Sequence, residues 1–263
     1  MKTVVITGST RGLGLGLARR FLDKGFNVVI NGSGDASVER ALKALSAFGE
    51  RVHGVAADVS SRSDVERLFN EAEKRFRQVD IWVNNAGLGQ PLRKAWEFGE
   101  DEISRIVDIN IKGVVHGTIV PFLAMKSRGT GKIFTMEGHG SKGAILDRMT
   151  IYGTSKSAAT YFTKSFAHEA IGSGITIGCL LPGMVVTDLL FDTVMDDTPE
   201  CRKRKLIYNM LADDVETVAV FLVDRMLSAT GSFCRIEWLT RRKAIFRLLF
   251  GKLRKRDFFR NEN

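Results

Sequence analysis

Short apolar runs of four to six residues alternate along the chain with longer segments in which apolar and polar residues mix at helical spacing. This alternation is typical of a parallel β-sheet that is covered by helices on both faces. It predicts an α/β fold with a doubly wound, seven-stranded parallel sheet. The expected strands are 3–7, 27–31, 52–57, 80–84, 132–136, 176–181 and 233–238. The expected helices begin near Gly12, Ser37, Arg62, Asp101, Thr150, Asp188 and Asp213.

Composition narrows the class of protein. The chain has 263 residues, of which 44% are hydrophobic and 26% charged, as in ordinary single-domain globular proteins. Its three cysteines lie too far apart for a disulfide framework or a metal site, so we expect no metal and a reducing compartment. The apolar run at Val4–Ile6 is too short for a signal peptide, and no apolar stretch approaches the roughly 18 residues of a membrane span. These features predict a cytoplasmic protein.

The net charge of +9 is concentrated in two late segments. Residues 235–263 hold ten basic and three acidic residues, and Arg202–Lys205 adds four basic residues in a row. The rest of the chain is close to neutral, which argues against nucleic acid as a partner, because such a domain carries basic residues across a recognition face. A local contact with an acidic partner or a membrane surface remains compatible with this distribution.

A glycine-rich loop follows the first predicted strand, in the segment Thr7–Gly14 that opens the first helix. Glycines allow the backbone to approach a phosphate closely, and the helix N-terminus offers unpaired N–H groups to the anion. The position between strand and helix indicates dinucleotide binding. The alternative is a purely structural turn.

The end of the second strand bears on the choice of cofactor. An NAD-dependent enzyme places an acid there for the ribose 2′-hydroxyl, but this chain has Gly32. Arg11, in the glycine loop, can instead pair with a 2′-phosphate. The sequence therefore favours NADP(H) over NAD(H). In the alternative interpretation Arg11 is a solvated loop residue and Asp35 contacts the ribose.

The glycine spacing TGxxxGxG resembles that of the classical short-chain dehydrogenase/reductase family, and further motifs follow in the family's order over about residues 1–230. The resemblance implies a Rossmann-type fold. It also implies an adenine contact at Asp58–Val59, the NNAG signature at Asn84–Gly87 and a nicotinamide carboxamide contact at Pro182–Thr187. The residues expected to bind the cofactor are Gly8, Ser9, Arg11, Gly12, Leu13, Gly14, Ser33, Asp58, Val59, Asn85, Ala86, Gly87, Tyr152, Lys156, Pro182, Gly183 and Thr187.

Tyr152 and Lys156 are spaced i and i+4, which places both on one helix face. A cation beside a phenol favours the phenolate, so we expect Lys156 to lower the pKa of Tyr152 and to prepare it for proton exchange with a carbonyl oxygen. An incidental pair is the alternative. Asn110 matches the family's active-site asparagine, which kinks a helix and supports a proton relay, although it could be an ordinary polar helix residue.

The family's catalytic serine is missing from its usual place, because aligning the fifth strand puts Gly138 at that position. Ser141 is the expected substitute, and His139 is a weaker one. The segment Met136–Ser141 resembles the Met-acid-Gly-x-Gly-Ser segment of the chlorophyll b reductase branch of the family. The stretches Pro182–Leu190 and Arg235–Thr240, and the basic end of the chain, are also similar to that branch.

The C-terminal segment is basic and apolar. On a helical wheel, Arg247, Arg254 and Lys255 lie opposite an apolar arc that runs from Ile245 to Leu253. Such a helix can contact an anionic membrane surface, or it can pack on its own domain. We therefore expect an NADP(H)-binding domain over 1–234, with a substrate lid around 188–211, and an extension over 235–263. An apolar, basic-edged lid suits a large amphiphilic substrate, although its charges could simply be solvated.

These features predict an NADPH-dependent reductase of a hydrophobic or amphiphilic carbonyl compound, with Tyr152, Lys156, Asn110 and Ser141 as the catalytic residues. The resemblance implies the formyl group of chlorophyll b, or of a related tetrapyrrole, as the substrate. A lipid, steroid or quinone carbonyl is the first alternative. A cofactor-binding sensor without turnover is the second. The family resemblance also implies a homodimer or homotetramer through the helices that begin near Asp101 and Thr150.

Overall fold

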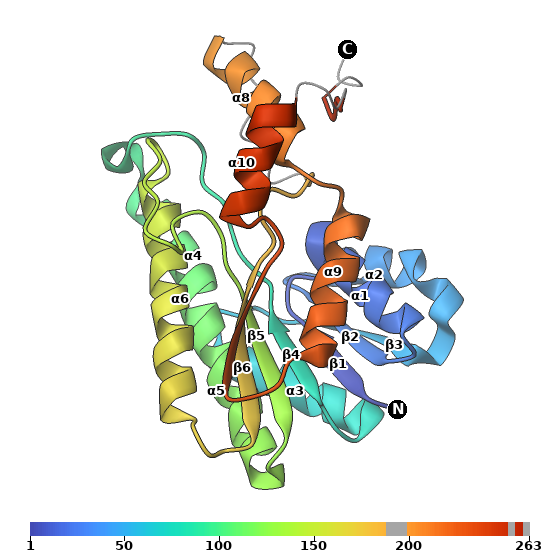
Figure 1. Ribbon diagram of the computed structural model, residues 1–263. Coiled ribbons are helices and arrows are strands. Elements are labelled where there is room, and N and C mark those ends of the chain that lie inside the picture. Colours follow the sequence, from blue (N-terminus) through green and yellow to red (C-terminus); the bar gives the residue numbers. More distant parts are fainter. Residues whose placement is uncertain (188–198, 252–255, 260–263) are drawn as a thin grey trace.

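Seven parallel strands form one sheet in the computed structural model, which describes residues 1–187, 199–251 and 256–259 (Figure 1). The order across the sheet is β3-β2-β1-β4-β5-β6-β7. The strands are β1 (Thr3–Ile6), β2 (Asn27–Gly32), β3 (Val52–Ala56), β4 (Ile81–Asn84), β5 (Gly131–Met136), β6 (Ile175–Leu181) and β7 (Phe233–Glu237). The expected Rossmann-type fold is confirmed, and every predicted strand lies within a residue or two of its observed bounds.

Helices cover both faces of this sheet. One face carries α1 (Gly12–Asp23), α2 (Asp35–Ala44) and α9 (Val215–Ser228), and the other carries α3 (Arg62–Phe76), α5 (Gly113–Arg128) and α6 (Thr150–Glu169). The remaining described helices are α4 (Glu100–Val107), α8 (Pro199–Leu211) and α10 (Arg241–Phe250), with short 3₁₀ turns at Ser46–Arg51 and Ala95–Glu97. The helix expected near Asp188 lies outside the described residues.

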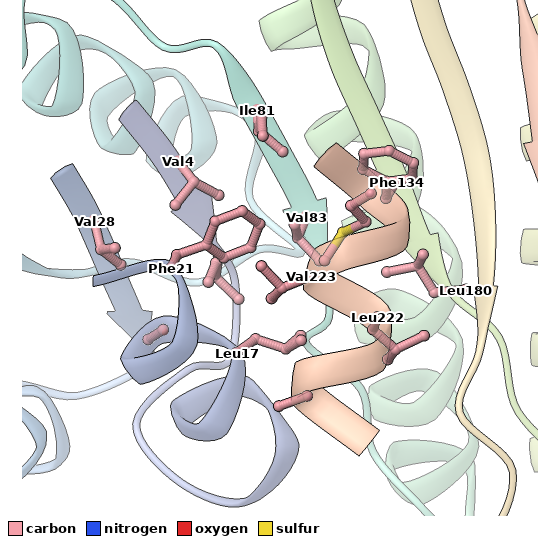
Figure 2. Packing of buried hydrophobic residues seen from close by; sticks show 14 of the residues in the cluster. Val4, Leu17, Phe21, Val28, Ile81, Val83, Phe134, Leu180, Leu222 and Val223 are labelled. Carbon is pink, nitrogen blue, oxygen red and sulfur yellow. The ribbon is translucent and has the colours of Figure 1, made fainter. Parts of the chain in front are cut away.

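The alternation of side chains along each strand builds two separate cores. Val4 and Ile6 of β1 face α1 and α9, whereas Val5 between them faces α3 and α5. The same division holds for β2 and β4. Figure 2 shows the first core, in which Phe21 of α1 and Leu222 of α9 pack over the strands. Both faces are therefore apolar, which explains why the strands have continuous apolar runs rather than alternating polarity.

One long helical stretch runs from Glu100 to Arg128 and joins α4 to α5 through a π-helical turn at Asp108–Lys112. By length and composition alone it could cross a membrane. However, α5 packs on β4 and β5, and its Val120 and Met125 belong to the second core. This stretch is therefore a core helix of the domain.

The strand order reverses between β1 and β4. From β1 the chain builds the sheet outward through β2 and β3, and from β4 it continues outward in the other direction. Loops that leave the carboxyl ends of β1 and β4 therefore diverge to opposite faces. In sheets of this type the crevice at the reversal point is where ligands bind.

The C-terminal helix α10 packs on α8 beyond the carboxyl end of the sheet (Figure 1). Asp213 is buried and joins them, because its carboxylate accepts hydrogen bonds from Arg247 (2.6 and 3.1 Å), Trp238 (2.6 Å) and Arg256 (3.0 Å). The neighbouring Asp214 caps α9 through the backbone N–H of Thr217. The boundary expected at residue 235 falls within β7, which is part of the sheet.

The amphipathic face of α10 is the reverse of the one expected. Arg247, placed on the solvated face by the wheel, is the buried residue of this helix. The large apolar residues are exposed instead, with Phe246 60% and Leu249 70% accessible. Sequence periodicity cannot reveal this inversion, since it depends on the distant carboxylate of Asp213.

Candidate active site

Thr7 ties β1 to β4 at the reversal point. Its hydroxyl accepts the backbone N–H groups of Asn85 and Ala86, both at 3.0 Å, and donates to the carbonyl of Val83 at 3.3 Å. The side-chain amide of Asn85 donates to the carbonyls of Thr7 and Gly8, both at 2.9 Å. The NNAG segment is thus held against the glycine loop by hydrogen bonds.

The glycine loop is shaped by close backbone contacts. Gly8 has a φ of +58°, and a Cβ there would lie 2.7 Å from Cα of Ala86. A Cβ on Gly14 would lie 2.8 Å from Cα of Ser9, so neither position accommodates a side chain. The helix α1 begins at Gly12 with no acidic residue in its first turn and no side-chain cap from Arg11. This bare, amide-rich cradle fits the pyrophosphate of a dinucleotide.

Asn31 supports the loop from β2. Its side chain accepts from the N–H of Gly8 at 3.2 Å and donates to the carbonyls of Val55 and Ala57. At the next position, a Cβ on Gly32 would lie 2.7 Å from side-chain atoms of both Thr10 and Ser37. The place where an NAD-selective acid would project is therefore already occupied.

The other expected cofactor residues line the same edge. Asp58 follows β3, is exposed and accepts from the N–H and hydroxyl of Ser60, while Val59 is buried in the second core. Ser33 is exposed after β2. On the opposite side Thr187 approaches the glycine loop, since a Cβ on Gly12 would lie 3.4 Å from its Cγ2. Pro182 and Gly183 lie between the end of β6 and Thr187, and Gly183 has a φ of +73°.

Tyr152 and Lys156 are both buried on the face of α6 that meets the end of β5. Lys156 donates to the carbonyl of Met136 at 3.4 Å. A Cβ on Gly138 would overlap the Tyr152 hydroxyl and would lie 3.3 Å from Cγ of Lys156. The tyrosine hydroxyl therefore fills the volume that a side chain at position 138 would need, which gives a physical reason for glycine where most of the resembled family has serine.

The expectation that Lys156 lowers the pKa of Tyr152 is wrong for the protein as described. Burial raises the pKa of Tyr152 to about 12, and burial also lowers the pKa of Lys156 to about 8. Both shifts disfavour the charged form of a group removed from water. At neutral pH Tyr152 is a neutral phenol that carries a proton.

Asn110 lies in the π-helical turn and connects three elements. Its side-chain amide donates to the carbonyl of Leu88 and to the hydroxyl of Ser155, both at 2.9 Å, and its oxygen accepts from the N–H of Leu88 at 2.8 Å. Gly87 next to it keeps the space between Asn110 and Lys156 open, since a Cβ there would lie 3.1 Å from Nζ of Lys156. Single π-turns inside α-helices are frequent at functional sites.

Ser141 is buried in the turn that follows β5. Its hydroxyl oxygen accepts the N–H of Gly138 at 3.1 Å, which leaves the hydroxyl proton available as a donor. His139 lies in the same turn, and burial lowers its pKa. Ser157 of α6 donates to the carbonyl of Gly140 at 2.7 Å and holds the turn against the helix.

Several contributors to this site were not predicted. Gln90 accepts the N–H of Tyr152 and donates to the carbonyl of Arg148, both at 2.6 Å, so it fixes the start of α6. Glu137 is buried beside Gly138 and pairs with Arg235. Asn31 was also not predicted, although a polar residue within the apolar run of β2 was a signal that could have found it. The partners of Gln90 and Glu137 lie too far along the chain for spacing rules to find them.

Comparison with known proteins assigns the family. Residues 2–197 match the family described as short chain dehydrogenase, so the chain belongs to that family. The chlorophyll(ide) b reductase NOL of Arabidopsis thaliana is 35% identical over 92% of this chain and 71% of its own length. The probable chlorophyll(ide) b reductase NYC1 of the same plant is 33% identical over 98% of this chain, which spans about half of that relative (54%).

A solved structure gives the same picture. The 3-ketoacyl-(acyl-carrier-protein) reductase from Brucella melitensis, complexed with NADH, is 27% identical with a TM-score of 0.76, over 90% of this chain and 96% of that chain. By sequence and by fold the chain therefore belongs to a family of oxidoreductases that use a nicotinamide cofactor. The resemblance to chlorophyll b reductases expected from the motifs is confirmed.

The contact between Gly138 and Tyr152 makes a prediction. Replacing Gly138 by serine restores the residue usual in the family, yet we expect it to displace Tyr152 and lower kcat by about tenfold or more, with a loss of about 1–3 kcal/mol in the free energy of unfolding. Gly153→Ser is the matched control, because a Cβ there meets only Cα of Gly140, at 3.9 Å. Steady-state kinetics and urea unfolding measure both effects. A Gly138→Ser protein with unchanged or higher kcat contradicts this account.

Proposed function

We propose that the protein is an NADPH-dependent reductase of a large hydrophobic carbonyl compound. The observation that carries this proposal is the buried, protonated Tyr152 beside Lys156 and Gly138, at the edge of the sheet where the glycine loop forms its cradle. Reduction needs a proton donor, and a phenol whose pKa is about 12 stays protonated through the physiological range. The bound nicotinamide supplies the hydride.

In this proposal each residue has a separate role. Tyr152 donates its proton to the carbonyl oxygen as that oxygen becomes an alkoxide. Lys156 holds the nicotinamide ribose and stabilises the phenolate that remains. Ser141 donates a hydrogen bond to the carbonyl oxygen in place of the missing serine. Asn110 fixes the gap between the Leu88 loop and α6, in which the relay water is expected to lie.

Exposed apolar residues around the site support a large apolar substrate. Trp96, Ile145 and Leu206 are all largely exposed, and they belong to segments that follow β4, β5 and β6. Because the carboxyl ends of parallel strands meet at one edge, we infer that these side chains lie beyond the same edge of the sheet as the site. Together with the relatives' names, this favours the formyl group of chlorophyll b or a related tetrapyrrole, reduced to hydroxymethyl.

Product analysis tests the substrate and the proton donor together. We expect NADPH and detergent-dispersed chlorophyll b to give the 7-hydroxymethyl product, identified by chromatography. The Tyr152→Phe protein should retain cofactor binding and lose about a hundredfold or more in kcat. No product with chlorophyll b, but turnover of a steroid, lipid or quinone carbonyl, would move the substrate to the alternative class. Tight NADPH binding without turnover of any carbonyl would favour the sensor interpretation and contradict the reductase.

We also propose that NADP(H) is preferred over NAD(H). The support is the crowded position at Gly32 together with the positive charge of Arg11 in the glycine loop. We expect Arg11→Ala to weaken NADPH binding by roughly tenfold or more and to leave NADH binding unchanged, because only NADPH carries the 2′-phosphate. Titration calorimetry with both cofactors measures this, with the exposed Arg19→Ala as the control. Equal losses for the two cofactors would contradict the assignment.

Peripheral membrane contact through α10 is part of the proposal. The exposed apolar face of this helix is bordered by the exposed cations Arg241 and Arg242, a pattern that suits an anionic lipid surface. The same charges disfavour pairing of two copies through α10. For assembly we propose a dimer or tetramer through α4, α5 and α6, where Leu123 and Tyr161 are exposed.

Vesicle sedimentation tests the membrane contact. We expect binding to vesicles that contain phosphatidylserine, but not to pure phosphatidylcholine, and loss of binding by about tenfold or more in Phe246→Ser/Leu249→Ser. Ile171→Ser is the matched control, since Ile171 is 63% exposed in the turn between α6 and β6. Binding that depends equally on Ile171, or no difference between the two kinds of vesicle, would overturn the assignment to α10.

A further inference from the structure

Glu137 carries a buried carboxylate next to Gly138. It follows β5 directly and precedes Gly138, and its side chain is 0% exposed. Its Oε2 accepts from Nε and Nη2 of Arg235, at 3.0 and 2.6 Å, and its Oε1 accepts from the hydroxyl of Thr160 at 3.1 Å. Three elements, β5, α6 and β7, therefore converge on one carboxylate.

The carboxylate of Glu137 and the side chain of Lys156 meet the same part of α6 and β5. Thr160 is one helical turn beyond Lys156 on α6, so Glu137 reaches the helix face that carries Tyr152 and Lys156. The amine of Lys156 donates to the carbonyl of Met136, and its stem passes close to Gly138. Lys156 therefore runs across the backbone of the residues on either side of Glu137.

A structural role alone does not require a charge here. Removing a carboxylate and a guanidinium from water is costly, and apolar replacements of buried ion pairs are often neutral or stabilising. Arg235 remains 25% exposed, whereas the side chain of Glu137 is 0% exposed. The carboxylate is thus buried within one helical turn of Lys156, whose amine makes a long hydrogen bond of 3.4 Å to the carbonyl of Met136.

The electrostatics agree with this geometry. Burial lowers the pKa of Lys156, and the Coulombic attraction of Glu137 opposes that shift. The neighbouring thiol of Cys179 stays protonated, because burial and Glu137 both raise its pKa. Other titratable groups lie on α6 itself and on the segments around it: Tyr152 and Lys164 on α6, His139 in the turn after β5, Arg235 on β7, and the ion pair of Asp108 with Lys112 in the π-helical turn, which packs on α6.

We propose that Glu137 is a positioning residue that keeps the buried Lys156 cationic, with Arg235 and Thr160 holding its carboxylate in place. The inference rests on the role of Lys156 in the proposed function. Glu137 and Arg235 are 98 residues apart along the chain, so their ion pair links strand β7 to Lys156.

Competitive labelling of Lys156 tests this without turnover. The cofactor-free protein is treated briefly with acetic anhydride across the neutral and alkaline range, and acetylation of the peptide that carries Lys156 is measured by mass spectrometry. We expect the wild-type amine to become reactive with a midpoint near pH 8. In Glu137→Gln the midpoint should fall by about one pH unit or more, because burial is then unopposed. In the active protein, the alkaline limb of kcat at saturating cofactor should shift in the same direction.

Two further variants make the result decisive. Glu237→Gln removes a carboxylate from β7, the strand that carries Arg235. Because Glu237 pairs with Lys142, its replacement should leave the midpoint for Lys156 unchanged. Glu137→Gln/Arg235→Gln removes both charges of the buried ion pair, so it serves if the single variant does not fold, and it should shift the midpoint downward. An unchanged midpoint in the folded Glu137 variants overturns the inference. A shifted midpoint in a protein that reduces no carbonyl would sustain it and remove the proposed function instead.

Discussion

The hydroxyl of Thr7 fixes the junction on which the site depends. By accepting the N–H groups of Asn85 and Ala86, it holds the carboxyl ends of β1 and β4 together at the point where the sheet changes direction. The glycine loop then has room only for backbone, because Gly8 contacts Ala86. The glycine loop, which we propose to bind phosphate, and the NNAG segment both take their positions from this junction.

The side of the site that carries Tyr152 depends on a second close contact at a glycine. Gly138 permits the hydroxyl of Tyr152 to reach the end of β5, and Gln90 fixes the first turn of the helix that carries it. Burial raises the pKa of Tyr152, so the phenol remains neutral, and it lowers the pKa of Lys156, a shift that the charge of the buried Glu137 opposes. Beyond this edge, Asp213 draws Arg247 inward and leaves the apolar face of α10 exposed.

Local patterns predicted what depends on neighbouring residues. Strand periods located the sheet correctly, and the i, i+4 spacing correctly placed Tyr152 and Lys156 on one face of α6. Long-range contacts were beyond that reasoning. The direction of the Tyr152 pKa depends on burial, and the orientation of α10 depends on a carboxylate 34 residues away from Arg247. The helix near Asp188 and the first part of the expected lid, residues 188–198, fall outside the described residues, whereas Pro199–Leu211 form α8.

Amide hydrogen exchange with and without NADPH tests the central claim most directly, namely that the β1–β4 edge and α6 form one dinucleotide and proton-transfer site. The account predicts slower exchange on binding in residues 8–14, in 85–88 and in the first turn of α6 around Tyr152. Exchange elsewhere, for example in α3, should not change. Protection confined to other segments, or none at saturating NADPH, would contradict the account.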